Sequence, residues 1–280
     1  MSNTRESKPN YKQEWLHQDR FPRTAKYDVD WILANEMGPN AVWLLEELCS
    51  RISFATNARV LDMGCGRAIT SIFLAREFGV QVFANDLWVS QDDNWMRVVE
   101  AGLEDRICPI RAEAHALPYA AGYFDAVVSI DSYQYFGTDD LYLGYITRFV
   151  KTGGLLGLVM PAILQELGDE PPPHLTERQS TGLAFWDPAE CWCLHSLDYW
   201  TRHFRRSGLV DIELAATVED GWKLWRDWER IRNGGGFTQF PSDVEVLEKD
   251  AGRFIGFVML VLRKRPRPKS KFDHALNIRL

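Results

Sequence analysis

The sequence predicts an α/β protein built on a doubly wound, mostly parallel sheet. Short apolar runs alternate with segments of helical spacing between about residues 59 and 160, and a glycine turn follows the first run. Strands that alternate with helices imply right-handed crossovers and therefore parallel strands. The composition, with 46% hydrophobic and 25% charged residues, is ordinary for a globular chain of 280 residues.

Seven apolar runs are the expected strands of this sheet. They are residues 59–63, 81–84, 106–111, 124–130 and 155–160, followed by a final pair at 211–216 and 254–262. Pro109 lies in the third run, and proline cannot donate a ladder hydrogen bond. We therefore expect the third strand at an edge of the sheet.

The chain is expected to have three parts. Residues 1–57 form an N-terminal arm and a cap helix, because apolar residues recur every three to four positions from Tyr27 to Ile52, with Met37-Gly38-Pro39-Asn40 as the entry to the helix. Residues 58–262 form the main domain, with insertions at about 161–194 and 218–250 over the carboxyl edge of the sheet. Residues 263–280 form a basic tail.

Charge and cysteine content restrict the partners and the compartment. The net charge is 32 − 39 = −7, which disfavours polyanions, although the tail has seven basic residues and one acid. The tail is read as solvated, and a nucleic-acid or membrane patch is the alternative. No apolar stretch is long enough for a membrane span, and the first 15 residues lack a signal-peptide core. Five cysteines without a Cys-x-x-Cys pair suggest a reduced, cytoplasmic protein.

The most informative segment is VLDMGCGRA at residues 60–68, in which a strand runs into a glycine turn and a helix. Glycine lets a ligand approach the backbone closely, so Gly64 and Gly66 are candidate binding residues. Asp62 would repel a pyrophosphate but suits a cationic group such as an ammonium. Ile69 stands where a dinucleotide fingerprint has its third glycine, which disfavours a nicotinamide cofactor.

Two further acids follow at the ends of later strands. Asp86 lies 20 residues after Gly66, and its two oxygens match a vicinal ribose diol. Glu113, after the third strand, is placed to accept from an exocyclic amine of a purine. Along the chain, the three acids would thus bind an ammonium group, a ribose and an adenine. A ligand with these three parts is S-adenosylmethionine.

On these residues the chain resembles the class I S-adenosylmethionine-dependent methyltransferases, including the small-molecule type 11 and cyclopropane-fatty-acid-synthase-like members. The matching segments are VLDMGCGRA, FANDLW, AEAHALPYAAGYFDAVVSIDS and FVKTGGLLGLVM, over about residues 58–160. The resemblance implies a Rossmann-like fold and methyl transfer to a small molecule. It also implies that Asp62, Gly64 and Gly66 line the methionine and ribose end, Asp86 and Leu87 the ribose and adenine, and Glu113 and Ala114 the adenine edge. Ala68 and Glu113 depart from the commoner glycine and aspartate.

The acceptor is expected over the end of the fourth strand, at residues 129–136. The Asn-Pro-Pro-Tyr motif of nucleic-acid and glutamine methyltransferases is absent there. Asp131 is a candidate base, acceptor-orienting group or partner of the sulfonium, or else a loop acid that bonds local backbone. Tyr133 is the second catalytic candidate. Tyr133 and Tyr135 either line the pocket or pack.

Two N- and C-terminal features are also candidates for the site. Lys26-Tyr27-Asp28, with Met37-Gly38-Pro39-Asn40 after it, is similar to an N-terminal segment with a Tyr-Asp pair that folds over the cofactor in cyclopropane-fatty-acid synthases, with a surface loop as the alternative. Trp222, Trp225 and Trp228 recur every three residues and form either core or an aromatic lid over the acceptor.

No metal is expected. Cys191, Cys193 and His195 do not match zinc spacings, and Asp139 and Asp140 are read as helix-capping acids. The predicted function is metal-independent methyl transfer to a small-molecule acceptor by in-line displacement, with no nucleic acid partner. The alternatives are lipid methylation or cyclopropanation, a non-catalytic S-adenosylmethionine-binding protein, and, more distantly, a nicotinamide oxidoreductase. The acceptor and the oligomeric state do not follow from the sequence.

Overall fold

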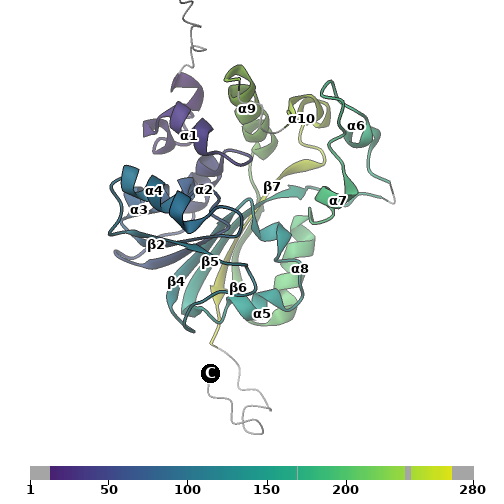
Figure 1. The fold of residues 1–280 in the computed structure, drawn as a ribbon. Helices are drawn as coiled ribbons and strands as arrows, with labels where there is room; N and C mark the ends of the chain where they lie inside the picture. The colour runs from purple at the N-terminus through teal and green to yellow at the C-terminus, as the bar shows by residue number, and fades with distance from the viewer. Residues whose placement is uncertain (1–12, 169, 237–240, 267–280) are drawn as a thin grey trace, which may run out of the picture.

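A computed structural model describes residues 13–168, 170–236 and 241–266, and shows one seven-stranded sheet in the order β3-β2-β1-β4-β5-β7-β6 (Figure 1). The strands are β1 (Arg59–Met63), β2 (Gln81–Asp86), β3 (Ile107–Arg111), β4 (Phe124–Ile130), β5 (Val150–Ile163), β6 (Val210–Thr217) and β7 (Ile255–Lys264). Five neighbouring strands, β3, β2, β1, β4 and β5, pair in parallel. β7 pairs antiparallel with both β5 and β6. The predicted α/β, mostly parallel fold is confirmed.

The predicted strands agree with the structure most closely at the centre of the sheet. β1 and β4 have the predicted bounds, and β3 is an edge strand in which Pro109 lies opposite Ala84. β5 is longer than predicted at both ends, and β7 continues to Lys264, two residues beyond the expected end of the main domain. Residues 1–12 of the predicted arm and residues 267–280 of the predicted tail lie outside the described residues.

The helices that cover the sheet begin with two short ones where the sequence predicted a single cap helix. Before β1 come α1 (Val29–Asn35) and α2 (Ala41–Cys49), and between later strands lie α3 (Ile69–Phe78), α4 (Gln91–Glu100), α5 (Tyr142–Ile146) and α8 (Leu197–Ser207). α1 and α2 are separated at Gly38-Pro39, because proline disfavours helical backbone in the residue before it. Asn40 caps α2, as its side chain accepts hydrogen bonds from the N–H groups of Val42 and Trp43 at 3.1 Å.

Each face of the sheet has its own apolar core. Val60 and Val128 pack on one face together with residues of α2 and α3, whereas Leu61 and Val127 pack on the other with residues of α5 and α8. Successive residues of a strand point to opposite faces, so burial on both faces requires continuous apolar runs. This is why the central strands were recognisable in the sequence.

The two insertions carry the four remaining helices. α6 (Pro173–Thr176) and α7 (Pro188–Cys191) follow β5, and α9 (Gly221–Gly234) and α10 (Val244–Asp250) lie between β6 and β7. All four lie beyond the end of the sheet opposite the C-terminal end of β7, which is the carboxyl edge of the parallel strands (Figure 1). Cys191 lies at the end of α7 and Cys193 in the turn after it. In the described part of the chain, no helix is long and apolar enough to span a bilayer.

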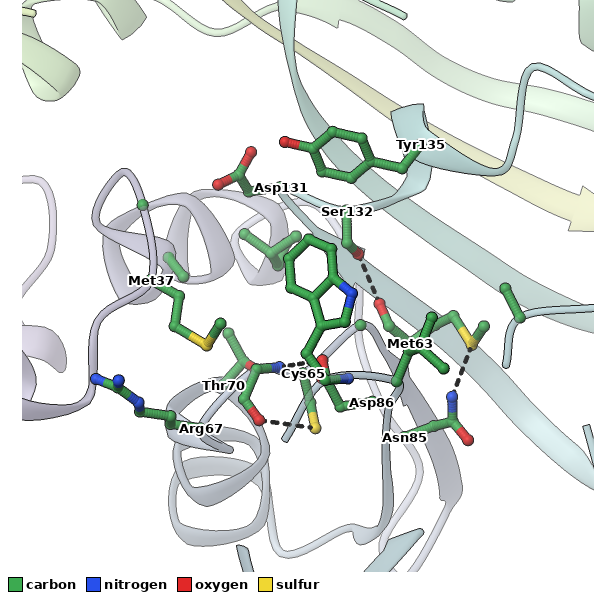
Figure 2. Close-up of a pocket in the computed structure, with 18 of the residues that line it drawn as sticks. Met37, Met63, Cys65, Arg67, Thr70, Asn85, Asp86, Asp131, Ser132 and Tyr135 are labelled. Atoms are coloured by element: carbon green, nitrogen blue, oxygen red, sulfur yellow. Dashed lines mark hydrogen bonds between the residues drawn. The ribbon is translucent and has the colours of Figure 1, made fainter. Parts of the chain in front are cut away.

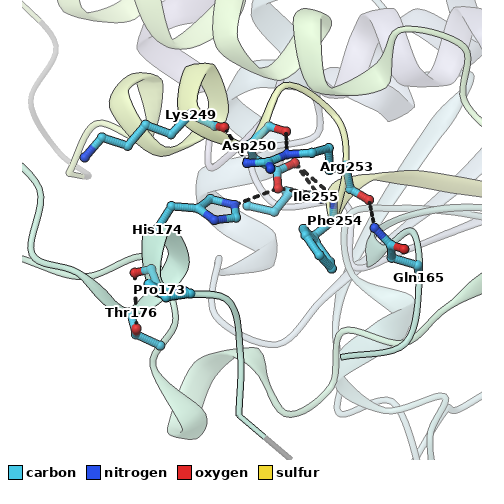
Figure 3. A network of polar contacts seen from close by, with 9 residues as sticks. All are labelled: Gln165, Pro173, His174, Thr176, Lys249, Asp250, Arg253, Phe254 and Ile255. Carbon is cyan, nitrogen blue, oxygen red and sulfur yellow. Dashed lines mark hydrogen bonds and ion pairs between the residues drawn. The ribbon is translucent and has the colours of Figure 1, made fainter. Parts of the chain in front are cut away.

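A buried carboxylate joins both insertions to the sheet (Figure 3). Asp250, at the end of α10, is 0% exposed and accepts hydrogen bonds from the N–H groups of Phe254 at 3.1 Å and Ile255 at 3.0 Å. Nε2 of His174, in α6, lies 2.9 Å from its Oδ1. Asp250 therefore links α6 and α10 to the start of β7.

Asp250→Ala is expected to lower the free energy of unfolding by about 2–4 kcal/mol, because it leaves two backbone N–H groups and an imidazole without their buried acceptor. Urea unfolding measures the loss. Asp198→Ala is the control, since Asp198 forms an exposed ion pair with Arg202 at 3.0 Å and its removal should change stability by at most about 0.5 kcal/mol. Equal losses in the two variants would contradict the role of Asp250.

Candidate functional site

A cavity of about 310 Å³ opens at the carboxyl ends of β1, β2 and β4 (Figure 2). It brings together most of the site residues that the sequence predicted. These are Gly64, Gly66, Asp86, Leu87, Glu113, Ala114 and Asp131, and the same wall includes Met37, Gly38, Trp88, Ser132 and Tyr135. Tyr27, Asp62 and Tyr133 are not among the described residues that line the cavity.

The glycine turn after β1 is shaped by close contacts. Gly64 has a φ of +72°, and a Cβ there would lie 2.4 Å from Oγ of Ser132. Gly66 has a φ of +53°, and a Cβ there would lie 3.0 Å from Sδ of Met37. L side chains rarely adopt such backbone angles, so a side chain at either position would be strained, and at Gly64 it would also collide with Ser132. Ala68 is also left-handed, with a φ of +60°, and lies at the N-cap of α3.

Asp86 lies at the end of β2 and binds backbone from two loops. Its Oδ2 accepts the N–H of Gly66 at 2.8 Å, and its Oδ1 accepts the N–H groups of Trp88 at 2.8 Å and Val89 at 2.9 Å. A carboxylate can accept about four hydrogen bonds, so Oδ2 keeps capacity for one ligand hydroxyl. In this geometry Asp86 can therefore accept a hydrogen bond from one of the two ribose hydroxyls that it was predicted to bind.

Asp62 is placed differently from the prediction. Asp62 is 1% exposed, is not among the described residues that line the cavity, and accepts hydrogen bonds from the hydroxyls of Thr70 and Ser71 at 2.6 Å. Burial raises the pKa of Asp62 to about 6, while the two hydroxyls act in the opposite direction. Asp62 therefore fixes the start of α3 behind the glycine turn, and the structure does not bring it to a ligand cation.

Glu113 and Ala114 line the cavity after β3, as predicted. Both oxygens of Glu113 are engaged by His115, whose N–H lies 2.8 Å from Oε2 and whose Nδ1 lies 2.9 Å from Oε1. Burial would raise the pKa of Glu113, but these hydrogen bonds outweigh it and hold the pKa below its ordinary value. His115 itself forms part of the wall.

Asp131 follows β4 in a strained conformation beside the cavity. It is left-handed, with a φ of +55°, and its Oδ1 accepts a hydrogen bond from Nε2 of Gln134 at 3.2 Å. Burial raises the pKa of Asp131 to about 7, which the Gln134 hydrogen bond partly offsets. In Figure 2 the hydroxyl of Tyr135 points toward this carboxylate. Strain at a non-glycine residue and a carboxyl that titrates near neutrality are features common at functional sites.

The two predicted tyrosines are placed in the core. Tyr133 is 1% exposed, packs against Trp200 and Phe204, and its hydroxyl has no hydrogen-bond partner among the described residues. Tyr27 is 6% exposed, packs on Phe73, and its hydroxyl lies 3.4 Å from Oε1 of Glu77. Of the predicted tyrosine pair after β4, Tyr135 is the member that lines the cavity.

The N-terminal segment does reach the cavity, but through Met37, Gly38 and Pro39. Met37-Gly38-Pro39-Asn40 was part of the segment predicted to fold over the cofactor, but Tyr27 was the residue chosen from it. The predicted aromatic lid is not formed, because Trp225 and Trp228 are buried in the core and neither they nor Trp222 belong to the lining of the described cavity.

The described residues contain no group of three or more His, Cys, Asp or Glu side chains arranged to hold a metal ion. Asp139 and Asp140 lie before α5, which begins at Tyr142, so they are not in its first turn as predicted. The metal-independence of the site stays a prediction.

Comparison with known proteins gives a family match over the same segment. Residues 60–154 match a family model described as a methyltransferase domain. The chain is 26% identical to erythromycin 3''-O-methyltransferase of Saccharopolyspora erythraea, over 71% of this chain and 66% of that protein. It is 32% identical to methyltransferase GfsG of Streptomyces halstedii, over 45% of this chain and 46% of that protein. The chain thus spans about two thirds and about half of the length of these relatives.

A solved structure of similar fold is the [4+2]-cyclase SpnF, with a TM-score of 0.60, 20% identity and coverage of 80% of this chain and 81% of that one. At that identity the likeness shows the fold alone, and the name of this neighbour means that the fold does not by itself fix the reaction. The family match, the relatives and the sheet together show that residues 60–154 are similar to a methyltransferase domain and lie on a Rossmann-like sheet.

Proposed function

We propose that this protein transfers a methyl group from S-adenosylmethionine to a small-molecule acceptor held in the cavity after β1, β2 and β4. The observation that carries the proposal is the convergence in one cavity of the glycine turn, Asp86 and Asp131, which leave three different strands. S-adenosylmethionine supplies an electrophilic methyl group on a sulfonium sulfur. The protein then has to bind the donor, hold the acceptor in line with it and exclude water.

The residues present fit this donor. Gly64 and Gly66 leave the turn open to the methionine part, and the remaining capacity of Asp86 Oδ2 suits a ribose hydroxyl. Ala114 and the Glu113 segment would face the base. Asp62 acts from behind the turn through Thr70 and Ser71.

The charges of the cavity favour a neutral or cationic acceptor. Asp86, Glu113 and Asp131 line it, against the guanidinium of Arg67, which donates to the carbonyl of Ala34 at 3.1 Å. Carboxylates repel phosphate groups, so phosphorylated acceptors and nucleic acid are disfavoured. The cytoplasm is the proposed compartment, because all five cysteines, which lie in the described residues, are free thiols.

Asp131 is the proposed base for an acceptor that arrives as a hydroxyl or an ammonium. Its carboxyl lines the cavity, and with a pKa of about 7 it can hold or release a proton near neutrality. Burial raises the pKa of the Tyr135 hydroxyl and of the Cys193 thiol, and the charge of Asp131 contributes a smaller part of the rise in both. Tyr135 takes the place beside the acceptor that was expected for Tyr133, the second catalytic candidate.

Calorimetry with S-adenosylmethionine, S-adenosylhomocysteine and NAD tests the donor, followed by transfer of labelled methyl groups to a metabolite extract. We expect both sulfur nucleosides to bind and a labelled small molecule to form. Binding of NAD alone would refute the donor. Nucleoside binding with no labelled product would favour the non-catalytic alternative.

Gly64→Ala is expected to weaken S-adenosylhomocysteine binding at least about tenfold, because its methyl group collides with Ser132 and displaces the turn. Gly122→Ala is the control: Gly122 has a similar φ of +62° but nothing within 4 Å of a new Cβ. Both variants should lose about 1–2 kcal/mol of stability from left-handed strain. Equal nucleoside affinities would contradict a donor site at this turn.

The rate of methyl transfer is expected to rise with pH and level off above about 7, because only the ionised form of Asp131 can accept a proton. Asp131→Asn should lower kcat by about 10²–10⁴ and remove this pH dependence. Asp198→Asn, on the exposed face of α8, is the control. A pH profile that persists in Asp131→Asn would assign the titration to another group.

Asp131→Asn, which should lower the rate of methyl transfer, should raise the stability of the fold at alkaline pH. The folded pKa of Asp131 exceeds the unfolded value of 3.8, so the unfolded chain releases this proton first and stability falls as pH rises from about 4 to 7. Asp131→Asn is therefore expected to be more stable than the wild type at pH 8, by about 1 kcal/mol or more. Asparagine also tolerates left-handed backbone. Urea unfolding at pH 5 and pH 8 measures the difference, and a less stable variant at pH 8 would contradict it.

A further inference from the structure

Residues 36–40, here called the cavity loop, join α1 to α2 and face both halves of the cavity. A Cβ on Gly38 would lie 2.6 Å from Oδ2 of Asp131, and Sδ of Met37 lies 3.0 Å from the position of a Cβ on Gly66. In Figure 2 the Met37 side chain reaches toward the residues of the glycine turn. The loop is therefore in contact with the proposed base and with the proposed donor turn.

Both polar groups of the Gly38 backbone are held by buried side chains. The N–H of Gly38 donates to Oε2 of Glu36 at 3.0 Å, and its carbonyl accepts from Nε1 of Trp228 at 3.1 Å. Trp228 belongs to α9 and is 0% exposed, and its ring lies edge-on to Trp43 in α2. Trp228 thus reaches a backbone position 190 residues away in sequence.

The carboxylate of Glu36 is fixed by a second residue of α9. Its Oε1 lies 3.8 Å from Nη1 of Arg232, which also pairs with Glu229 and donates to the carbonyl of Pro241 at 3.2 Å. Glu36, Glu229 and Arg232 are at most 3% exposed. Burial raises the pKa of Glu36 above its ordinary value, against the charge of Arg232.

Trp228 and Arg232 lie one helical turn apart on α9 and contact two residues of the same loop, Gly38 and Glu36. An apolar contact would have served to pack α9 against α1 and α2 without burying charges. Directional hydrogen bonds instead fix where the Gly38 peptide lies, because an unpaired buried carbonyl costs about as much as a lost hydrogen bond. Neither residue lines the described cavity.

From these contacts we propose that Trp228 and Arg232 are positioning residues for the cavity. Through Gly38 and Glu36 they hold the cavity loop against Asp131 and the glycine turn, and so set the affinity of the site for the nucleoside of the methyl donor. The link to the nucleoside rests on the proposed function, whereas the hold on the loop does not.

Trp228→Phe tests the proposal, because it removes the indole N–H and keeps an aromatic ring. Trp225→Phe is the matched control: Trp225 is on the same helix, is 8% exposed, and packs on Phe257 and Phe185. Hydrogen–deuterium exchange of residues 36–40 and calorimetry with S-adenosylhomocysteine are measured for both variants. Urea unfolding corrects each result for general loss of stability.

In Trp228→Phe the exchange of the cavity loop is expected to rise about five- to tenfold, and the Kd for S-adenosylhomocysteine to rise by a similar factor. Trp225→Phe should match the wild type in both. Equal loop exchange in the two variants overturns the proposal, and so does faster exchange with an unchanged Kd. A wild-type protein that binds no sulfur nucleoside refutes the proposed function and the nucleoside link with it, while the exchange data still decide whether Trp228 holds the loop.

Discussion

The carboxylate of Asp86 is the contact on which the rest of the site depends. It binds the N–H of Gly66 in the loop after β1 and those of Trp88 and Val89 in the loop after β2. These loops leave neighbouring parallel strands at one edge, since Met63 pairs with Asn85 in the sheet. The register of two strands and one acid therefore determine where the turn, and anything bound to it, lies.

The acids near the cavity differ in what surrounds them, and this difference separates their roles. Asp86 receives three backbone donors, Asp62 receives two hydroxyl donors behind the turn, and Asp131 receives a single amide donor from Gln134. Donors stabilise an ionised carboxylate, whereas burial without them favours the protonated form. Asp131 is thus the acid suited to exchange a proton with the methyl acceptor. Asp86 is suited to accept hydrogen bonds from the methyl acceptor or from the methyl donor.

The sequence was sufficient for the sheet, for the glycine turn and for the acids at strand ends, because burial on both faces leaves continuous apolar runs and parallel strands bring their carboxyl ends together. It was less informative about side-chain direction. Val60 packs toward α3, and Asp62 lies on the same face of β1 as Val60. Strict alternation along the strand would therefore have placed the Asp62 carboxylate on the α3 side of the sheet. Tyr133 and Tyr135 occupy a single 3₁₀ turn, where no regular alternation tells which ring turns inward.

Contacts between distant segments explain the remaining differences. The three tryptophans of α9 have a spacing that fits either core or lid, and contacts with distant segments decide between them: Trp225 packs on Phe257 of β7, and Trp228 on Trp43 of α2. Trp228 has features of both alternatives: its ring is buried in the core, and its one hydrogen bond to the cavity loop determines a wall of the cavity. Met37 faces the donor turn and Gly38 faces Asp131, so the cavity loop forms a wall shared by both halves of the cavity. Because Trp228 and Arg232 of α9 hold this loop without lining the cavity themselves, one helix bears on both halves at once.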